Sequence, residues 1–150
     1  MAEAFGLAAG VLQVAGFGAE LGSALWTCAK KIRHANDELR ALANQVDATA
    51  KCLESVSRLL DDPETSAFHS SKLYEDTNAV SQGCNEIFLE LDKAVKKYND
   101  GGLKLSVLAR LKWPLDSQKL AEPLKVLKNY NDVLHLMLAV LQIVEGRRAA

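Results

Sequence analysis

Apolar residues recur at alternating intervals of three and four along most of the chain, which is the period of an α-helix with one buried face. The apolar and polar residues do not alternate as they would in a strand. Between residues 39 and 60 the apolar stripe consists of Leu39, Leu42, Val46, Thr49, Leu53, Val56 and Leu60. Asp61-Asp62-Pro63 follows and predicts the end of this helix, because the residue before a proline disfavours helical geometry.

A second stripe of the same period predicts another helix, which Ser70 or Ser71 caps at its start. Its members are Leu73, Thr77, Val80, Cys84, Ile87, Leu91 and either Ala94 or Val95. The run 99–102 predicts the end of this helix, since Asn, Asp and Gly tolerate left-handed conformations. Residues 103–112 form a basic amphipathic segment, for which we expect a short extra helix that stops at Trp113-Pro114.

A third stripe predicts the last long helix, beginning at Asp116 or Ser117. Its members are Leu120, Leu124, Leu127, Asn131, Leu134, Leu138 and Leu141. Pro123 lies about six residues inside this helix, so we expect a kink or a late helix start there. Together with an apolar helix from about 4 to 34, the stripes predict an all-α protein. We expect a single domain over residues 1–150 that forms a four-helix bundle with one short extra helix.

The N-terminal segment has an unusual composition, because residues 4–29 contain Glu20 as their only charged residue. A helix needs about 20 apolar residues to cross a bilayer, so this segment suffices if Glu20 is paired, protonated or facing water. Each glycine costs about 1 kcal/mol in a soluble helix relative to alanine. Glycines one turn apart let helices approach closely. Two such pairs occur, Gly6 with Gly10 and Gly18 with Gly22.

One interpretation is a central helix of the bundle, apolar all round because its neighbours surround it. A second is that this helix can also leave the bundle. The large side chains it would expose are Phe5, Leu7, Val11, Leu12, Val14, Phe17 and Leu21. Exposing them to water would cost on the order of 10–20 kcal/mol, comparable with the stability of a whole domain. Release is therefore conceivable only into lipid or into an oligomer. We expect a helix that is buried at rest and lipid-exposed when active, with Glu20 as the charge that its insertion must accommodate.

The composition is that of one soluble globular domain, with 150 residues, 49 % apolar and 25 % charged. The net charge of −1 argues against nucleic-acid binding through a dominant basic face. This charge is unevenly distributed, since residues 59–92 carry a net −7 and residues 93–150 a net +6. Such regions either attract one another across a bundle or provide a basic face for anionic lipid headgroups. The candidates for headgroup contact are Lys93, Lys96, Lys97, Lys104, Arg110 and Lys112.

Signals for catalysis or metal binding are poor. Three widely spaced cysteines without a C-x-x-C motif argue against a disulfide framework or a zinc site: Cys28, Cys52 and Cys84. Three histidines lie in different segments without metal-ligand spacing: His34, His69 and His135. His135 is adjacent to the last stripe and is interpreted as a boundary residue. We expect no enzyme, no metal and no cofactor. The cysteines and the lack of a basic N-terminal signal region favour the cytosol.

Two stretches carry a resemblance to a known family. The first is residues 2–16, Ala-Glu-Ala-Phe-Gly-Leu-Ala-Ala-Gly-Val-Leu-Gln-Val-Ala-Gly. The second is Leu111-Lys112-Trp113-Pro114-Leu115, followed by Leu120, Leu124, Leu127, Tyr130, Asn131, Leu134 and Leu138-Ala139-Val140-Leu141-Gln142. In this order and separation they resemble the N-terminal domain of fungal STAND proteins (NOD-like receptors) of the HeLo-like group. The resemblance covers most of the chain, and Pro123 departs from the pattern expected inside the last helix.

The resemblance implies a helical bundle at the front of a receptor-like protein, with a nucleotide-binding receptor module in the same or another chain. Related HeLo and mixed-lineage-kinase-like bundles kill cells by oligomerising and permeabilising the plasma membrane through their first helix. By this resemblance the segment Phe5–Leu21 is the inserting element and Trp113-Pro114 a structural corner. We therefore expect a cell-death effector that is cytoplasmic at rest and acts at the plasma membrane. Its expected partners are further copies of itself and anionic lipids. The alternative is a soluble signalling or oligomerisation adaptor domain of such a receptor, without membrane insertion.

Overall fold

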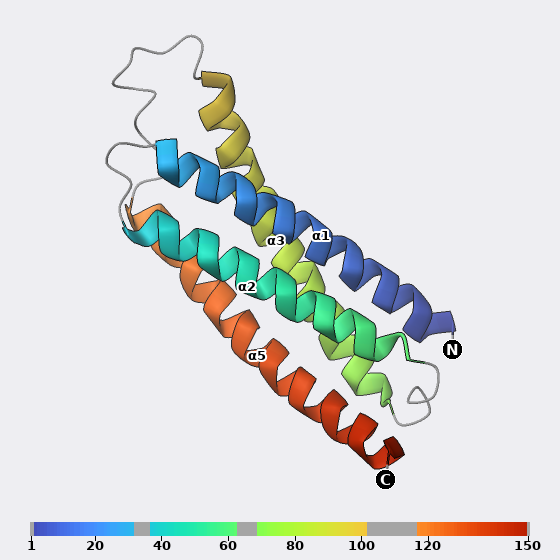
Figure 1. Ribbon diagram of the computed structural model, residues 1–150. Coiled ribbons are helices and arrows are strands. Elements are labelled where there is room, and N and C mark those ends of the chain that lie inside the picture. Colours follow the sequence, from blue (N-terminus) through green and yellow to red (C-terminus); the bar gives the residue numbers. More distant parts are fainter. Residues whose placement is uncertain (1, 32–36, 63–68, 102–116, 150) are drawn as a thin grey trace.

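Four long helices make up the part of the chain that the computed structural model describes, which is residues 2–31, 37–62, 69–101 and 117–149. They are α1 (Ala2–Lys31), α2 (Asp37–Leu60), α3 (Ser71–Gly101) and α5 (Ser117–Ala149), and no strand occurs in these ranges (Figure 1). The prediction of an all-α protein with four long helices is confirmed. The expected short helix at 103–112 and the corner at Trp113-Pro114 lie outside the described residues.

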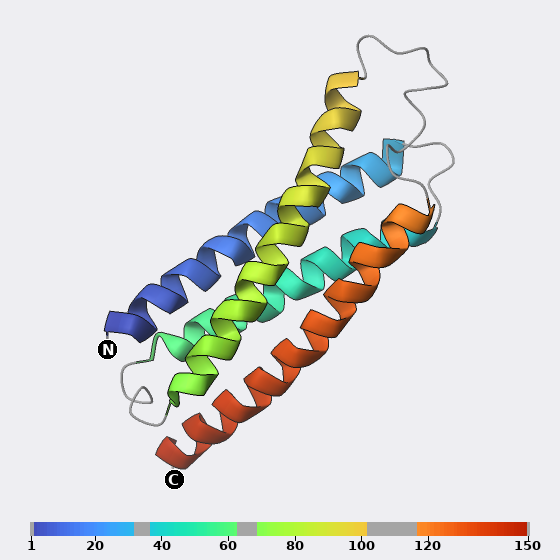
Figure 2. The ribbon, with the colours of Figure 1, turned by 180° about the vertical axis from the view of Figure 1, so that it is seen from behind.

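The four helices form an up-down bundle whose two chain ends lie at the same end (Figures 1 and 2). α1 packs most extensively against α2, and α2 packs against α5. α3 contacts both α1 and α5 and closes the ring, so α1 and α5 occupy opposite corners. The C-terminal end of α3 extends beyond the other three helices (Figures 1 and 2).

α2 buries the face that its stripe predicts. All seven stripe residues are at most 1 % exposed, including Thr49, whose hydroxyl donates a hydrogen bond to the Gln45 carbonyl of the preceding turn at 2.7 Å. This internal bond satisfies the hydroxyl, so a polar residue is accommodated in an apolar stripe. Every residue of the predicted stripe is therefore buried, and the same helix also buries Ala43, Ala50, Cys52 and Ser57, which the stripe does not contain.

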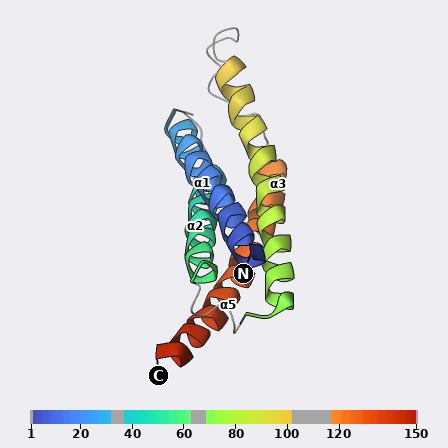
Figure 3. The ribbon, with the colours of Figure 1, turned by 90° about the vertical axis from the view of Figure 1, so that its right-hand side faces the viewer.

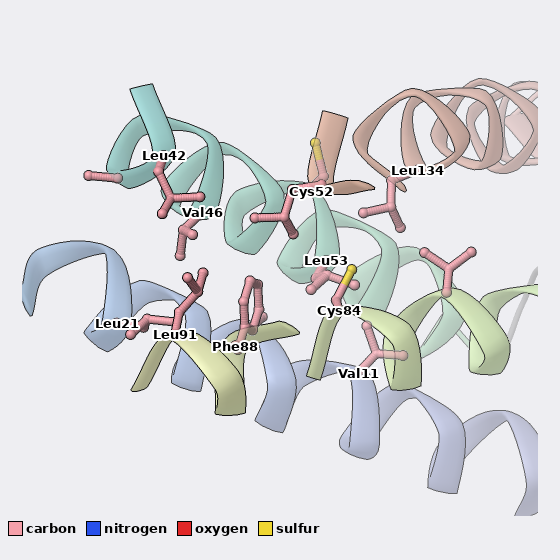
Figure 4. Close-up of a cluster of buried hydrophobic side chains, with 14 of the residues drawn as sticks. Val11, Leu21, Leu42, Val46, Cys52, Leu53, Cys84, Phe88, Leu91 and Leu134 are labelled. Atoms are coloured by element: carbon pink, nitrogen blue, oxygen red, sulfur yellow. The ribbon is translucent and has the colours of Figure 1, made fainter. Parts of the chain in front are cut away.

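α3 buries most of its predicted stripe and one aromatic residue outside it. Thr77, Val80, Cys84 and Leu91 are buried, whereas Leu73 and Ile87 are half-buried. Phe88, which the stripe omits, is completely buried (Figure 4). Its ring lies edge-on to Phe17 of α1, with ring centroids 6.1 Å apart. At the start of α3 the Ser70 hydroxyl accepts a hydrogen bond from the backbone N–H of Leu73 at 3.0 Å, so Ser70 is the N-cap.

α5 runs as a single helix through Pro123, and the expectation of a late helix start there is wrong. Pro123 is buried, as are the stripe residues Leu127, Leu134 and Leu141. Proline removes one backbone donor from the helix interior. The apolar contacts of Leu127, Leu134 and Leu141 hold the helix against the bundle after that defect.

Candidate functional site

α1 presents one face to the core, where Val11 and Leu21 are buried (Figure 4). The same face buries Ala8, Ala15, Leu25, Cys28 and Ala29. Of the other residues expected to insert into a membrane, Leu7, Val14 and Phe17 are half-buried against the core. Leu12 is 51 % exposed. The side chain of Phe5 lies outside the described residues.

The outward face of α1 is open to solvent, so the interpretation of a helix surrounded on all sides is wrong. A bundle of four helices leaves one side of each helix uncovered, and Figure 3 shows α1 as one corner of the bundle. The exposed positions of α1 are mostly small or uncharged: Gly6, Ala9, Gly10, Leu12, Gln13, Gly16, Ala19, Ser23 and Thr27. Glu20 and Lys30 are the charged residues among the exposed positions described in this helix.

The glycines of α1 fall into two groups. A Cβ at Gly18 would lie 2.7 Å from the Phe88 ring and 3.1 Å from the Ala50 Cβ, so α1 approaches α2 and α3 closely there. At Gly22 an added Cβ would meet the backbone of Asp47 in α2 at 3.4–3.5 Å. Both positions have the close packing expected for them.

Three other glycines have no such role in the bundle. A Cβ at Gly6, Gly10 or Gly16 would meet nothing within 4 Å. The close packing expected at Gly6 and Gly10 is therefore absent from this structure. Each of these glycines lowers the stability of α1 by about 1 kcal/mol relative to alanine. Packing within the bundle does not compensate for this loss.

α1 is attached to the bundle by apolar contacts, and a hydrogen bond joins it to α2. The buried Ser57 hydroxyl donates a hydrogen bond to the Ala8 carbonyl at 2.7 Å. The ion pairs in the described ranges join residues four apart within α2 or α3, and none of them reaches α1. Detaching α1 would therefore break apolar packing but no described salt bridge.

The segment Gly6–Lys30, 25 residues long, has the length and composition of a membrane-crossing helix. Core helices of soluble proteins pass the same test, and α1 is partly such a helix because Val11, Leu21 and Leu25 are at most 2 % exposed. What distinguishes α1 from an ordinary core helix is its outward face, where a soluble helix normally carries charges.

Three of the six basic residues expected to contact lipid headgroups lie in the described part of the chain. Lys93, Lys96 and Lys97 are exposed on the projecting end of α3, and Lys96 pairs with Asp92 at 2.9 Å. That exposed pair leaves the positive charge accessible to solvent and contributes little stability. Lys104, Arg110 and Lys112, like Trp113 and Pro114, lie outside the described residues.

A polar cluster between α2 and α5 was not predicted. The Cys52 thiol donates a hydrogen bond to Asn131 Oδ1 at 3.2 Å and lies 3.8 Å from His135 Nε2. Burial raises the pKa of the Cys52 thiol, which keeps it protonated and unreactive at neutral pH. His135 lies at the edge of the α2–α5 contact, in agreement with its interpretation as a boundary residue. The sequence contained one indication of this cluster, since the polar residue Asn131 interrupts a stripe of leucines.

No arrangement for metal binding occurs within the described residues, where no three His, Cys, Asp or Glu side chains gather. The thiol of Cys84 is completely buried, and this burial raises its pKa to about 12. The candidate functional element is therefore α1 itself. Comparison with known proteins adds no assignment, since no family model, curated protein or solved structure matches the chain.

Proposed function

We propose that this bundle is a membrane-targeting, cell-death-inducing effector domain. In the proposed mechanism α1 detaches from the bundle, the domains oligomerise, and the inserted helices permeabilise the plasma membrane. At rest the domain is cytoplasmic, with α1 packed on α2 and α3. The fungal receptor relationship, with its nucleotide-binding module, is part of this proposal and rests on the sequence resemblance alone.

The observation that supports insertion is the outward face of α1. Gly6, Gly10 and Gly16 weaken the helix, and a Cβ added at any of them would meet nothing within 4 Å. In a membrane, by contrast, small residues one turn apart allow close contact between helices. Glu20 is already solvent-exposed at rest, so in a membrane it would need a water-filled path or a cation.

The exposed lysines at the end of α3 support a preference for anionic lipids. Lys93, Lys96 and Lys97 lie within five residues of one another, and each basic side chain near an anionic surface contributes about 1 kcal/mol. Because the C-terminal end of α3 projects beyond the other three described helices, these residues can reach a flat surface before those helices do (Figure 2).

A covalent tether between α1 and α2 tests the proposal. The Cβ of residue 22 would lie 3.5 Å from the Cβ of Asp47, within the range of a disulfide. The variant carrying Gly22→Cys and Asp47→Cys should therefore lock α1 onto α2 when oxidised. We expect the oxidised variant to release no dye from vesicles containing phosphatidylserine, and reduction to restore leakage.

Gly22→Cys alone is the matched control and should leak in both redox states. Equal leakage by the oxidised and reduced double variant would show that α1 does not need to leave α2, and would refute the proposed mechanism. Absence of leakage in every form would favour the alternative, a soluble adaptor domain. That alternative is supported by the burial of Val11 and Leu21, which keeps α1 in the bundle in water.

A further inference from the structure

α5 has a second apolar face that the bundle does not cover. Of the exposed large hydrophobic side chains in the described ranges, four lie on this helix: Val133 (38 % exposed), Leu136 (69 %), Val140 (51 %) and Ile143 (58 %). Their intervals of three, four and three place them on one side of the helix, and we call them the α5 stripe. The core-facing Leu134 and Leu141 lie on a different side. The predicted stripe of this helix contained none of the four.

The α5 stripe is continuous and uncharged. No Asp, Glu, Lys or Arg occurs between Asp132 and Glu145. Single exposed apolar residues such as Leu89 on α3 are ordinary, whereas a contiguous row of them marks a contact surface. The row carries no charge that would select an oppositely charged partner.

We propose that the α5 stripe is a contact surface between two copies of this chain, paired antiparallel about a twofold axis. The 3-4-3 spacing of the stripe reads the same in both directions along the helix. With the axis midway along the stripe, Leu136 of one copy meets Val140 of the other, and Val133 meets Ile143. A twofold contact requires this kind of self-complementarity, because the same patch must serve on both copies.

The size of the stripe fits a weak, concentration-dependent pair. Its four side chains expose on the order of 350 Å² of apolar surface, within the usual size of a functional patch. Two such patches with their borders at Asn129 and Ala139, both exposed, bury about 1,000 Å² in total, the lower end for a specific interface. Confinement to a membrane surface would raise the effective concentration and favour the pair.

This inference deepens the self-association part of the proposed function and rests on that part alone, since it does not require α1 to move. Sedimentation velocity of the whole chain, without lipid, tests it over a series of increasing protein concentrations, because an interface of this size is weak. We expect a shift from monomer to dimer as the concentration rises. Leu136→Lys should weaken the dimer at least tenfold. The matched control Leu89→Lys, at a position that is 46 % exposed on α3, should leave it unchanged.

Charge complementation tests the antiparallel register. Val140→Asp alone should also weaken the dimer, and mixing it with Leu136→Lys should restore association, because the new charges meet across the twofold axis. Both positions are exposed, so circular dichroism should show an unchanged helical fold. A chain that stays monomeric throughout, a dimer indifferent to Leu136→Lys, or an unrestored mixture would overturn the proposal.

A further outcome would overturn the proposed contact between two copies. If the chain stayed monomeric and Leu136→Lys abolished its binding to vesicles, the α5 stripe would be a lipid-binding surface. Failure of this proposal can be distinguished from failure of the proposed function. Leakage by the oxidised Gly22→Cys/Asp47→Cys variant bears on α1 alone, whereas sedimentation without lipid bears on the α5 stripe alone.

Discussion

The same substitution at two glycines of α1 should have opposite effects on stability. Gly10→Ala places a methyl group where nothing lies within 4 Å. Gly18→Ala places a methyl group 2.7 Å from Phe88 Cε2 and 3.0 Å from Phe88 Cζ. Both substitutions remove the same conformational freedom from the unfolded chain, so the difference between them measures the packing of α1 at Gly18, against Phe88 of α3 and Ala50 of α2.

The expected magnitudes follow from helix propensity and overpacking. Gly10→Ala should raise the free energy of unfolding by about 1 kcal/mol, the difference in helix propensity between the two residues. For a domain of this size that corresponds to a rise in Tm of roughly 2–4 °C. Gly18→Ala has the same gain but must displace the fully buried Phe88 ring, at a cost of about 1–3 kcal/mol. We expect Gly18→Ala to be net destabilising, by about 1 kcal/mol.

Denaturation by urea, followed by far-ultraviolet circular dichroism, measures both changes. The slopes of the two unfolding curves should match that of the wild type if only stability has changed. Adding Phe88→Leu to Gly18→Ala should recover part of the loss, because the smaller side chain makes room for the methyl group. This double-mutant cycle isolates the contact between the two positions.

A Gly18→Ala variant as stable as Gly10→Ala would contradict this prediction. In that case α1 would not pack on Phe88, and the described close approach of α1 to α3 would be absent in solution. A destabilising Gly10→Ala would instead show that the outward face of α1 is covered in the free protein.

Two further predictions concern buried polar groups. Ser57→Ala should lower the free energy of unfolding by about 1 kcal/mol, because it deletes the hydrogen bond to the Ala8 carbonyl. Because this bond holds α1 on α2, the variant should also release dye from vesicles faster than the control Ser55→Ala. Equal leakage rates in the two variants would contradict this prediction. The buried thiol of Cys84 should lower the stability of the protein at high pH. The thiol ionises near pH 9 in the unfolded chain, whereas burial raises its pKa in the folded protein to about 12. The free energy of unfolding should therefore fall as the pH rises from 9 to 12. Denaturation curves at several pH values should therefore show the stability gap between the wild type and Cys84→Ala shrinking above about pH 9, and a constant gap would contradict this assignment.

The sequence predicted the helices and most of their buried faces because these depend on local periodicity. The stripe of α2 is buried at every position, since a regular 3-4 pattern allows one way of covering it. Phe88 was missed because it lies one residue beyond the stripe, and its burial depends on the space that Gly18 leaves on a distant helix. Such a contact between two helices has no signature in either segment alone.

Only the structure distinguishes the covered face from the exposed face in α1 and in α5. α1 is apolar or small at nearly every position, so its sequence does not indicate which glycines pack and which lie open. α5 contains more leucine, valine and isoleucine than one face can bury. The pattern of its buried residues Leu127, Leu134 and Leu141 predicted one apolar face and gave no indication of the exposed one. In α1, and in α5 between Asp132 and Glu145, the near absence of charged residues removes the contrast between apolar and polar positions on which periodicity depends.

The placement of these two faces makes insertion and self-association compatible. α1 and α5 occupy opposite corners of the ring, and each packs mainly on α2 and α3 (Figure 3). A second copy bound to the α5 stripe would therefore leave the outward face of α1 uncovered. Departure of α1 would remove its packing on α2 and α3 but would leave the α2–α5 contact in place, including the hydrogen bond between Cys52 and Asn131. The helix proposed to enter the membrane is thus a different one from the helix proposed to hold the copies together, and each can be disabled without altering the surface of the other.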